Sequence, residues 1–379
     1  MTNLTEVKMI KFTLTIFIVA AFLIADCYSD PVIKMLRQEN YQAEKHAVKT
    51  KDGYILTMHR IPNPNRPPIL LMHGLADSTK GYLRYSSKSS TALELFELGY
   101  DIWMVNARAN IYSRQHIHLN ASDPQFWDFT WHEIGVYDIP ATIDYILEHT
   151  NHTKLAFIGT SQGTTAILVT LSELPEYNEK LSVANLMAPA IIFKHMHAAF
   201  PKSIKLVNML GEWLQLGGLN DLVPHSLASS IQVIAPFCMM PIGSELCKNV
   251  VFTYCGPSIQ YYDGMILSMS HYPAGSSYKQ FVHFGQLMAT GKFHKFDYED
   301  EAKNMEMYGS QLPPEYDLSK ITTKIHMLYG SNDFLAPLEN IPLIVEKLTS
   351  SIVTLSKFPG YNHMDFTYGR NLKQVNKKL

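Results

Sequence analysis

A serine lies between two glycines in the segment LAFIGTSQGTTAILV, residues 155–169. Its centre, GTSQG at 159–163, follows a strand-like apolar run and precedes a helix-like one, which is the context of the sharp turn that exposes a nucleophilic serine. Glycines suit such a turn because side chains at those positions would crowd it. The pattern predicts that Ser161 is a nucleophile. The alternative is a glycine-rich turn in which the serine only caps the helix.

A serine hydroxyl needs a base to become a good nucleophile, and the base needs an orienting carboxylate. Asp333 and His363 follow the serine in the order that suits an acid and a base, and each comes just after an apolar run. Catalytic groups gather at such positions, where parallel strands end. Asp365 is a competing acid, but it lies beside the histidine and follows no strand-like run. The simpler role for Asp333 is to close a turn.

Acyl transfer also needs two N–H groups that face the developing oxyanion. We expect one from Gln162, directly after the serine, and the other from Leu75 in the loop HGLADS, which follows the apolar run at 69–72. The alternative for His73 and Gly74 in this loop is a plain turn.

Short apolar runs alternate with helical patterns such as IPATIDYILEH and TTAILVTLSEL, and several of these runs are apolar at every position, as in strands covered on both faces. A hairpin is expected around the turn at Asp52 and Gly53. The other expected strands are residues 69–72, 102–105, 155–158, 183–187, 325–329 and 352–355. The alternation predicts an α/β fold with a mainly parallel central sheet.

The alternation breaks for roughly 120 residues, too long for an unstructured loop, so we expect an inserted helical subdomain there. A helix at 203–216 within it is apolar on more than one face. The expected division is a signal peptide at 1–29, the first part of the core at 30–192, a helical cap and lid at 193–316, and the second part of the core at 317–379.

The N-terminus is typical of an export signal: Lys8 and Lys11 precede an apolar stretch at 12–25, and Ser29 suits cleavage. That stretch is shorter than the ~20 residues that span a membrane, so an anchor is the weaker alternative. No later segment is long and apolar enough to span. A net charge of -2, without a basic block, argues against a nucleic-acid partner.

Beyond the signal, three cysteines, Cys238, Cys247 and Cys255, predict one disulfide and one free thiol in an oxidising compartment. Turn-forming residues between the first two favour their pairing, and Cys255 is the other possible partner of Cys247. Zinc is the alternative, but no histidine lies in this cluster at finger-like spacing. The sequons at Asn120 and Asn151 predict surface glycosylation.

Several motifs together resemble the acid lipase family, which includes gastric and lysosomal acid lipases: LLMHGLADS, FWDFTWHEIGVYDIPATIDYIL, GTSQGTT, HYPAGSSYKQFVHFGQ, YGSNDFLAP and YNHMDF. The resemblance implies an α/β-hydrolase core with a helical cap that hydrolyses triacylglycerols or cholesteryl esters at a lipid interface, in a secreted or lysosomal setting, without a metal or organic cofactor. The family's nucleophile, acid and base fall on Ser161, Asp333 and His363. Its oxyanion donors fall on Leu75 and Gln162, and its cap disulfide on Cys238 and Cys247.

The sequence departs from the family pattern at Thr160, where the family commonly has histidine, and at Val105 and Ala109, where it has glycine. If those glycines serve positive φ angles, the replacements strain the loop. Two other functions remain open. One is a lipid-binding or carrier protein with little turnover, and the other is an esterase for small soluble esters.

Overall fold

The computed structural model describes residues 30–83, 90–197, 221, 235–262, 265–269 and 271–379. The expected signal at 1–29 and the expected apolar helix at 203–216 lie outside these residues. No helix among the described residues has the length and apolar character of a membrane span.

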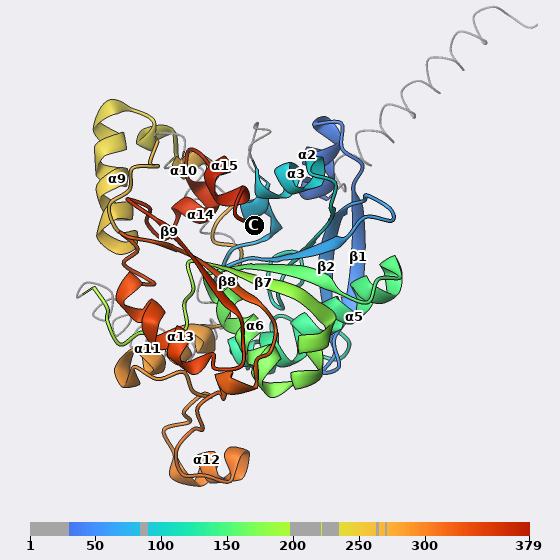
Figure 1. The fold of residues 1–379 in the computed structure, drawn as a ribbon, viewed down its shortest axis with the longest axis vertical. Helices are drawn as coiled ribbons and strands as arrows, with labels where there is room; N and C mark the ends of the chain where they lie inside the picture. The colour runs from blue at the N-terminus through green and yellow to red at the C-terminus, as the bar shows by residue number, and fades with distance from the viewer. Residues whose placement is uncertain (1–29, 84–89, 198–220, 222–234, 263–264, 270) are drawn as a thin grey trace, which may run out of the picture.

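One twisted sheet forms the centre of the molecule, with strand order β1-β2-β4-β3-β6-β7-β8-β9, and β5 pairs with β2 (Figure 1). β2 runs antiparallel to β1, β4 and β5, and every pair from β4 to β9 is parallel. The strands are β1 (Glu44–Lys49), β2 (Tyr54–Ile61), β3 (Pro68–Met72), β4 (Asp101–Val105), β5 (Gln115–His116), β6 (Leu155–Thr160), β7 (Leu181–Met187), β8 (Ile325–Gly330) and β9 (Val353–Phe358). The predicted mainly parallel α/β fold is confirmed.

Helices cover both faces of this sheet (Figure 1). A π-helical turn, Ile134–Asp138, joins α4 to α5. The helices are α2 (Pro31–Gln38), α3 (Thr91–Glu97), α4 (Trp131–Glu133), α5 (Ile139–Thr150), α6 (Gln162–Glu173), α9 (Pro241–Cys255), α10 (Met265–Ser268), α11 (Tyr278–Thr290), α12 (Glu301–Tyr308), α13 (Ile341–Lys347), α14 (Asp365–Tyr368) and α15 (Lys373–Asn376).

Strand β3 shows why the central strands are apolar at every position. All five of its residues are buried. Leu70 and Met72 belong to one hydrophobic cluster, while Ile69 and Leu71 belong to another. Side chains alternate between the faces of a strand, so each cluster is the core between the sheet and one layer of helices.

Between β7 and β8, the described residues form the helices α9 to α12 and contribute no strand to the sheet. In Figure 1, α9 lies beyond the β9 edge, and α12 projects away from the rest of the molecule. This segment contains most of the region expected as an insertion.

Cys238 and Cys247 are joined by a disulfide, and Cys255 carries a free thiol. The chain turns between the bonded pair at Met239 and Met240, before α9, whose first residue is Pro241 and which contains the expected turn-forming residues Gly243 and Ser244. Proline suits the first position of a helix, because the amide it lacks would have no helical partner there. Cys255 ends the same helix, about 12 Å along its axis from Cys247. Both predicted glycosylation residues, Asn120 and Asn151, are exposed.

Candidate active site

Ser161 stands at a sharp turn between the last residue of β6 and the first residue of α6. Its φ of 52° and ψ of -118° are strained for a residue with a side chain. The flanking glycines make this turn possible. A Cβ at Gly159 would lie 2.8 Å from the backbone of Gly163, and a Cβ at Gly163 would lie 2.5 Å from the carbonyl oxygen of Met72. The turn therefore tolerates no side chain at either position.

The structure brings Ser161, His363 and Asp333 into one hydrogen-bonded chain. The His363 Nε2 atom lies 2.8 Å from the Ser161 Oγ atom, and the Nδ1 atom lies 2.9 Å from Asp333 Oδ2. Asp333 follows β8 and His363 follows β9, so the carboxyl ends of parallel strands deliver both residues.

The Asp333 carboxylate is buried and held by the backbone around it. Its Oδ1 atom accepts hydrogen bonds from the amides of Leu335 at 2.9 Å and Ala336 at 2.7 Å. These amides close the turn that the sequence suggested for this aspartate. The turn and the contact with His363 therefore coexist, because they use different lone pairs of one carboxylate.

Asp365, the competing acid, points elsewhere. Its carboxylate accepts hydrogen bonds from the Ser258 hydroxyl and from the backbone amide of Asn362. Burial, and then the charge of Asp333, raise the pKa of Asp365 to about 6. The geometry favours Asp333 as the partner of His363.

The loop expected to supply an oxyanion donor lies against the serine. A Cβ built on Gly74 would be 3.3 Å from the Cβ of Ser161, and Leu75 lines the same cavity as that serine. Gln162 begins α6, where an N–H has no partner within the helix. Among the described residues, neither the Leu75 amide nor the Gln162 amide has a hydrogen-bond acceptor.

His73 holds this loop in place. Its Nδ1 atom donates to the Gly74 carbonyl at 2.7 Å, and its Nε2 atom accepts from the Ala107 amide at 3.1 Å. One donating and one accepting nitrogen correspond to a neutral imidazole. Burial lowers the pKa of His73, which agrees with that state.

A cavity of about 260 Å³ opens beside Ser161 and His363. Most of its wall is apolar, and α11 contributes Phe281, Phe284 and Met288. The other described residues that line it are Gly74, Leu75, Asp77, Thr160, Ala190, Phe193, Tyr272, Leu335, Met364, Thr367 and Tyr368.

Sequence reasoning missed a second polar cluster, of which two members, Asp77 and Tyr368, line this cavity. Asp77 accepts hydrogen bonds from His271 Nε2 at 2.9 Å and from the Tyr368 hydroxyl at 2.8 Å. These partners lie 194 and 291 residues away from Asp77 along the chain. No local pattern could have linked them, because each residue by itself is typical of an ordinary loop or helix end.

The departures from the family pattern have different structural effects. The Thr160 hydroxyl lies 2.9 Å from the Tyr82 hydroxyl, which donates to the Met72 carbonyl. Val105 ends β4 and has no positive φ. Ala109 has a φ of 61°, so its Cβ does impose the expected strain.

Several known proteins resemble this chain in sequence or in fold. A family model described as "Partial alpha/beta-hydrolase lipase region" matches residues 32–85, and one described as "alpha/beta hydrolase fold" matches residues 67–205. Lipase 1 of Drosophila melanogaster is 36% identical over 91% of this chain and 77% of its own length. Gastric triacylglycerol lipase of Bos taurus is 32% identical over 90% of this chain and 88% of its own.

Lysosomal acid lipase/cholesteryl ester hydrolase of Macaca fascicularis is 30% identical over 89% of this chain and 86% of its own. Among solved structures, a monoglyceride lipase from Saccharomyces cerevisiae superimposes with a TM-score of 0.54 at 15% identity, covering 88% of this chain and 92% of its own. That likeness concerns the fold, whereas the sequence relatives concern the family. The chain belongs to the acid lipase family of α/β hydrolases, together with the gastric and lysosomal acid lipases.

Proposed function

We propose that this protein is a serine ester hydrolase of lipids, with Ser161 as nucleophile, His363 as base and Asp333 as orienting acid. The observation that carries the proposal is the continuous hydrogen-bonded chain from the Asp333 carboxylate through His363 to the Ser161 hydroxyl, at the mouth of an apolar cavity. A serine, an imidazole and a carboxylate in this order are the components of acyl transfer through a covalent intermediate.

In the first half of the reaction, the Ser161 oxygen attacks the ester carbonyl while His363 Nε2 takes the hydroxyl proton. The tetrahedral intermediate collapses when the same nitrogen returns that proton to the departing alcohol, which leaves an acyl group on Ser161. In the second half, water attacks the acyl carbonyl, gives its proton to His363, and releases the fatty acid as the proton returns to Ser161. Asp333 accepts from Nδ1–H throughout and so keeps Nε2 turned toward the serine.

The amides of Leu75 and Gln162 are proposed as the oxyanion donors. Two findings support them: the Gly74 backbone lies against Ser161, and α6 begins at Gln162. Donors fixed before the reaction stabilise the developing charge without reorganisation during it. The contacts of His73 with Gly74 and Ala107 keep the loop that carries Leu75 in position.

The proposed substrates are triacylglycerols or cholesteryl esters presented at an oil–water or membrane interface. The apolar wall of the cavity suits long acyl chains. The bovine relative is named as a triacylglycerol lipase and the macaque relative as a cholesteryl ester hydrolase, which supports these two ester classes. We propose residues 193–316 as the cap of the site, because α11 supplies three apolar side chains to the cavity wall. In this proposal, residues 30–192 and 317–379 form the two parts of the α/β-hydrolase core on either side of the cap in the sequence.

Export is part of the proposal, with either an extracellular or a lysosomal destination. The disulfide between Cys238 and Cys247 supports an oxidising compartment. The exposure of Asn120 and Asn151 leaves both sequons open to glycosylation.

One comparative assay tests the function. Purified protein is given emulsified triacylglycerol, emulsified cholesteryl ester and a short-chain soluble ester, with Ser161→Ala as the matched control. We expect turnover of at least one emulsified lipid that is lost in the variant. Turnover of the soluble ester alone would support a small-molecule esterase. Lipid binding without turnover of any ester would support a carrier protein and refute the proposal.

A further inference from the structure

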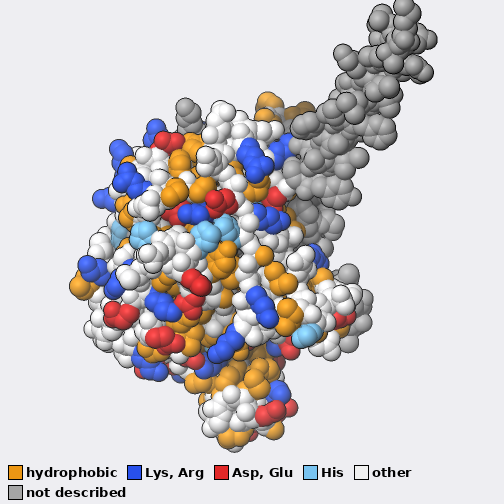
Figure 2. Space-filling model, turned by 90° about the vertical axis from the view of Figure 1, so that its right-hand side faces the viewer, with side chains coloured by type: hydrophobic (Ala, Val, Ile, Leu, Met, Phe, Trp, Pro, Cys, Tyr) orange, Lys and Arg blue, Asp and Glu red, His pale blue; other side chains and the backbone are white. Residues whose placement is uncertain are grey.

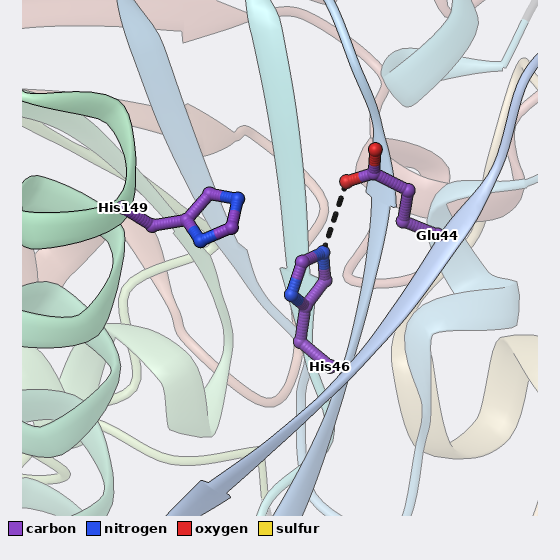
Figure 3. Close-up of side chains that lie close together, drawn as sticks. All are labelled: Glu44, His46 and His149. Carbon is purple, nitrogen blue, oxygen red and sulfur yellow. Dashed lines mark hydrogen bonds and ion pairs between the residues drawn. The ribbon is translucent and has the colours of Figure 1, made fainter.

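Glu44, His46 and His149 form a cluster of ligand-type side chains that line no part of the cavity beside Ser161. One side-chain atom from each residue lies within 4.8 Å of those of the other two. In Figure 3, the His149 ring on α5 points toward β1, which carries the other two side chains. Figure 2, which views the molecule from its β1 side, shows histidines grouped beside acidic and basic side chains.

The positions of the three residues on β1 and α5 bring their side chains together. Glu44 and His46 are two positions apart on β1, so their side chains project from the same face of the strand. His149 lies in the last turn of α5, which packs against that face. The cluster joins the edge strand of the sheet to the helix that covers it.

His46 has a polar partner at each ring nitrogen. Its Nδ1 atom lies 3.0 Å from the Tyr145 hydroxyl, and its Nε2 atom lies 3.0 Å from Glu44 Oε2. A carboxylate only accepts, so without an ion Nε2–H donates to Glu44 and the Tyr145 hydroxyl donates to Nδ1. When a metal ion replaces the Nε2 proton, Nδ1–H donates to the Tyr145 oxygen instead, which keeps Nε2 turned toward the ion. The Tyr145 ring also stacks on His149, with ring centroids 5.7 Å apart. One tyrosine therefore contacts both imidazoles.

The charges around the cluster leave room for a cation. Arg60 donates to Glu44 Oε2 at 2.9 Å, but its guanidinium is also bound at two points by Asp101, at 3.0 and 3.1 Å. One positive charge thus faces two carboxylates, so the Glu44 charge is not fully balanced. A divalent ion would supply the missing positive charge.

We infer that Glu44, His46 and His149 bind a divalent transition metal ion, with Zn²⁺ as the best match. Two imidazoles and one carboxylate, with water completing the shell, are a ligand set that zinc accepts, whereas Ca²⁺ and Mg²⁺ prefer oxygen ligands. Zinc bonds of about 2.0–2.1 Å place ligand atoms about 3.3 Å apart in a tetrahedral site. The ligand atoms of the pair on β1, 3.0 Å apart, are already close to this spacing, and His149, which is exposed, closes the remaining gap by rotating its side chain.

The ion would act as a structural clip between β1 and α5. An edge strand is paired on only one side, so a bond from its side chains to the covering helix restrains it. No residue of the cluster belongs to the proposed hydrolytic machinery, so the clip and the hydrolysis can be tested separately.

Calorimetric titration of the purified full chain with ZnCl₂, after EDTA treatment and removal of the chelator, tests the site directly. We expect one ion per chain, with affinity reduced at least about 10-fold by His149→Gln or Glu44→Gln. Tyr145→Phe should weaken binding by about 10-fold, because it frees the His46 ring. The matched control is His118→Gln, which removes another exposed histidine outside the cluster and should leave binding unchanged.

Two further measurements guard against a folding artefact in the variants. Zinc at 100 times its dissociation constant should raise the unfolding midpoint of the unaltered protein by about 3–6 °C. The same zinc concentration should raise that of His149→Gln by no more than about half as much, because the affinity of this variant is at least about 10-fold lower. Anomalous scattering at the zinc edge should place the ion about 2.0–2.2 Å from the three ligand atoms. Unchanged affinity in both ligand variants, or an ion located elsewhere, would overturn the inference.

Discussion

Two buried aspartate–histidine pairs lie in the same part of the molecule and have the same contact distance. His363 meets Asp333 at 2.9 Å, and His271 meets Asp77 at 2.9 Å. The pairs differ in which imidazole nitrogen the carboxylate holds. Asp333 holds Nδ1, which leaves Nε2 facing Ser161, whereas Asp77 holds Nε2 itself.

The second pair is a junction between segments. Asp77 belongs to the loop proposed to supply an oxyanion donor, His271 to the segment between β7 and β8, and Tyr368 to the C-terminal part of the chain. In the proposed mechanism, a buried aspartate–histidine contact acts as a proton-transfer unit only when the opposite nitrogen reaches a nucleophile. Otherwise, it holds loops together. Four experiments on these pairs and their surroundings test that distinction.

The largest effect should come from the nucleophile and base. Ser161→Ala and His363→Ala should each lower kcat for ester hydrolysis by about 10⁶-fold, because each removes the same proton-transfer unit. Steady-state and single-turnover assays measure the loss. The double variant should be no slower than either single variant. A further drop of about 10²-fold or more in the double variant would mean that the two residues act independently.

The same substitution in both pairs gives the most direct contrast. Asp333→Asn should lower kcat by about 10⁴-fold, because an asparagine amide favours the wrong imidazole tautomer. Asp77→Asn should lower kcat on a soluble ester by no more than about 10-fold, since it only loosens a loop. Equal losses in the two variants would show that the second pair also takes part in the chemistry.

Asp77→Asn should instead reveal itself in stability. Removing the charged acceptor of the two buried hydrogen bonds from His271 and Tyr368 costs about 3 kcal/mol of unfolding free energy. Burial by itself would raise the pKa of Asp77, but the hydrogen bond and charge of His271 lower it below its usual range. This contribution is therefore complete above about pH 4 and is lost as the pH falls through the lowered pKa. Urea unfolding at pH 7 and at successively lower pH measures both effects, and equal stability of both proteins at pH 7 would contradict the junction role.

Asp365 should show the opposite pH dependence with a smaller effect. Its pKa is raised to about 6, mainly by burial. Its contribution is complete below about pH 4 and is lost as the pH rises through 6, a change of about 2–3 kcal/mol. Urea unfolding at pH 4 and pH 6 should show this loss in the unaltered protein but not in Asp365→Asn. The variant should keep kcat within about 10-fold, and a loss as large as that of Asp333→Asn would make Asp365 the orienting acid.

Element boundaries show where local patterns stop being informative. The strand expected at 352–355 is β9, which spans residues 353–358. Its second half includes the polar residues Ser356 and Lys357, because this edge strand is partly exposed, so the apolar pattern ended before the strand does. The short strand β5 was not expected, because its two polar residues are too few to show the alternation of apolar and polar side chains that predicts a strand. Pro241, Gly243 and Ser244, which we expected to form a turn between the bonded cysteines, lie in the first turn of α9, because proline suits the first position of a helix.

The sequence by itself determined the α/β fold, the strand-to-helix turn at Ser161, and the candidate order of serine, aspartate and histidine. Each of these features can be read from the periodicity of apolar residues or from residues close together in the chain, because side-chain direction and local sterics fix them without distant contacts. Only the tertiary structure decided that Asp333 rather than Asp365 faces His363, that Asp77 joins His271 and Tyr368, and that His149 meets the side chains of β1. These contacts connect segments far apart in sequence, and the direction of a side chain within them depends on the packing of the whole sheet.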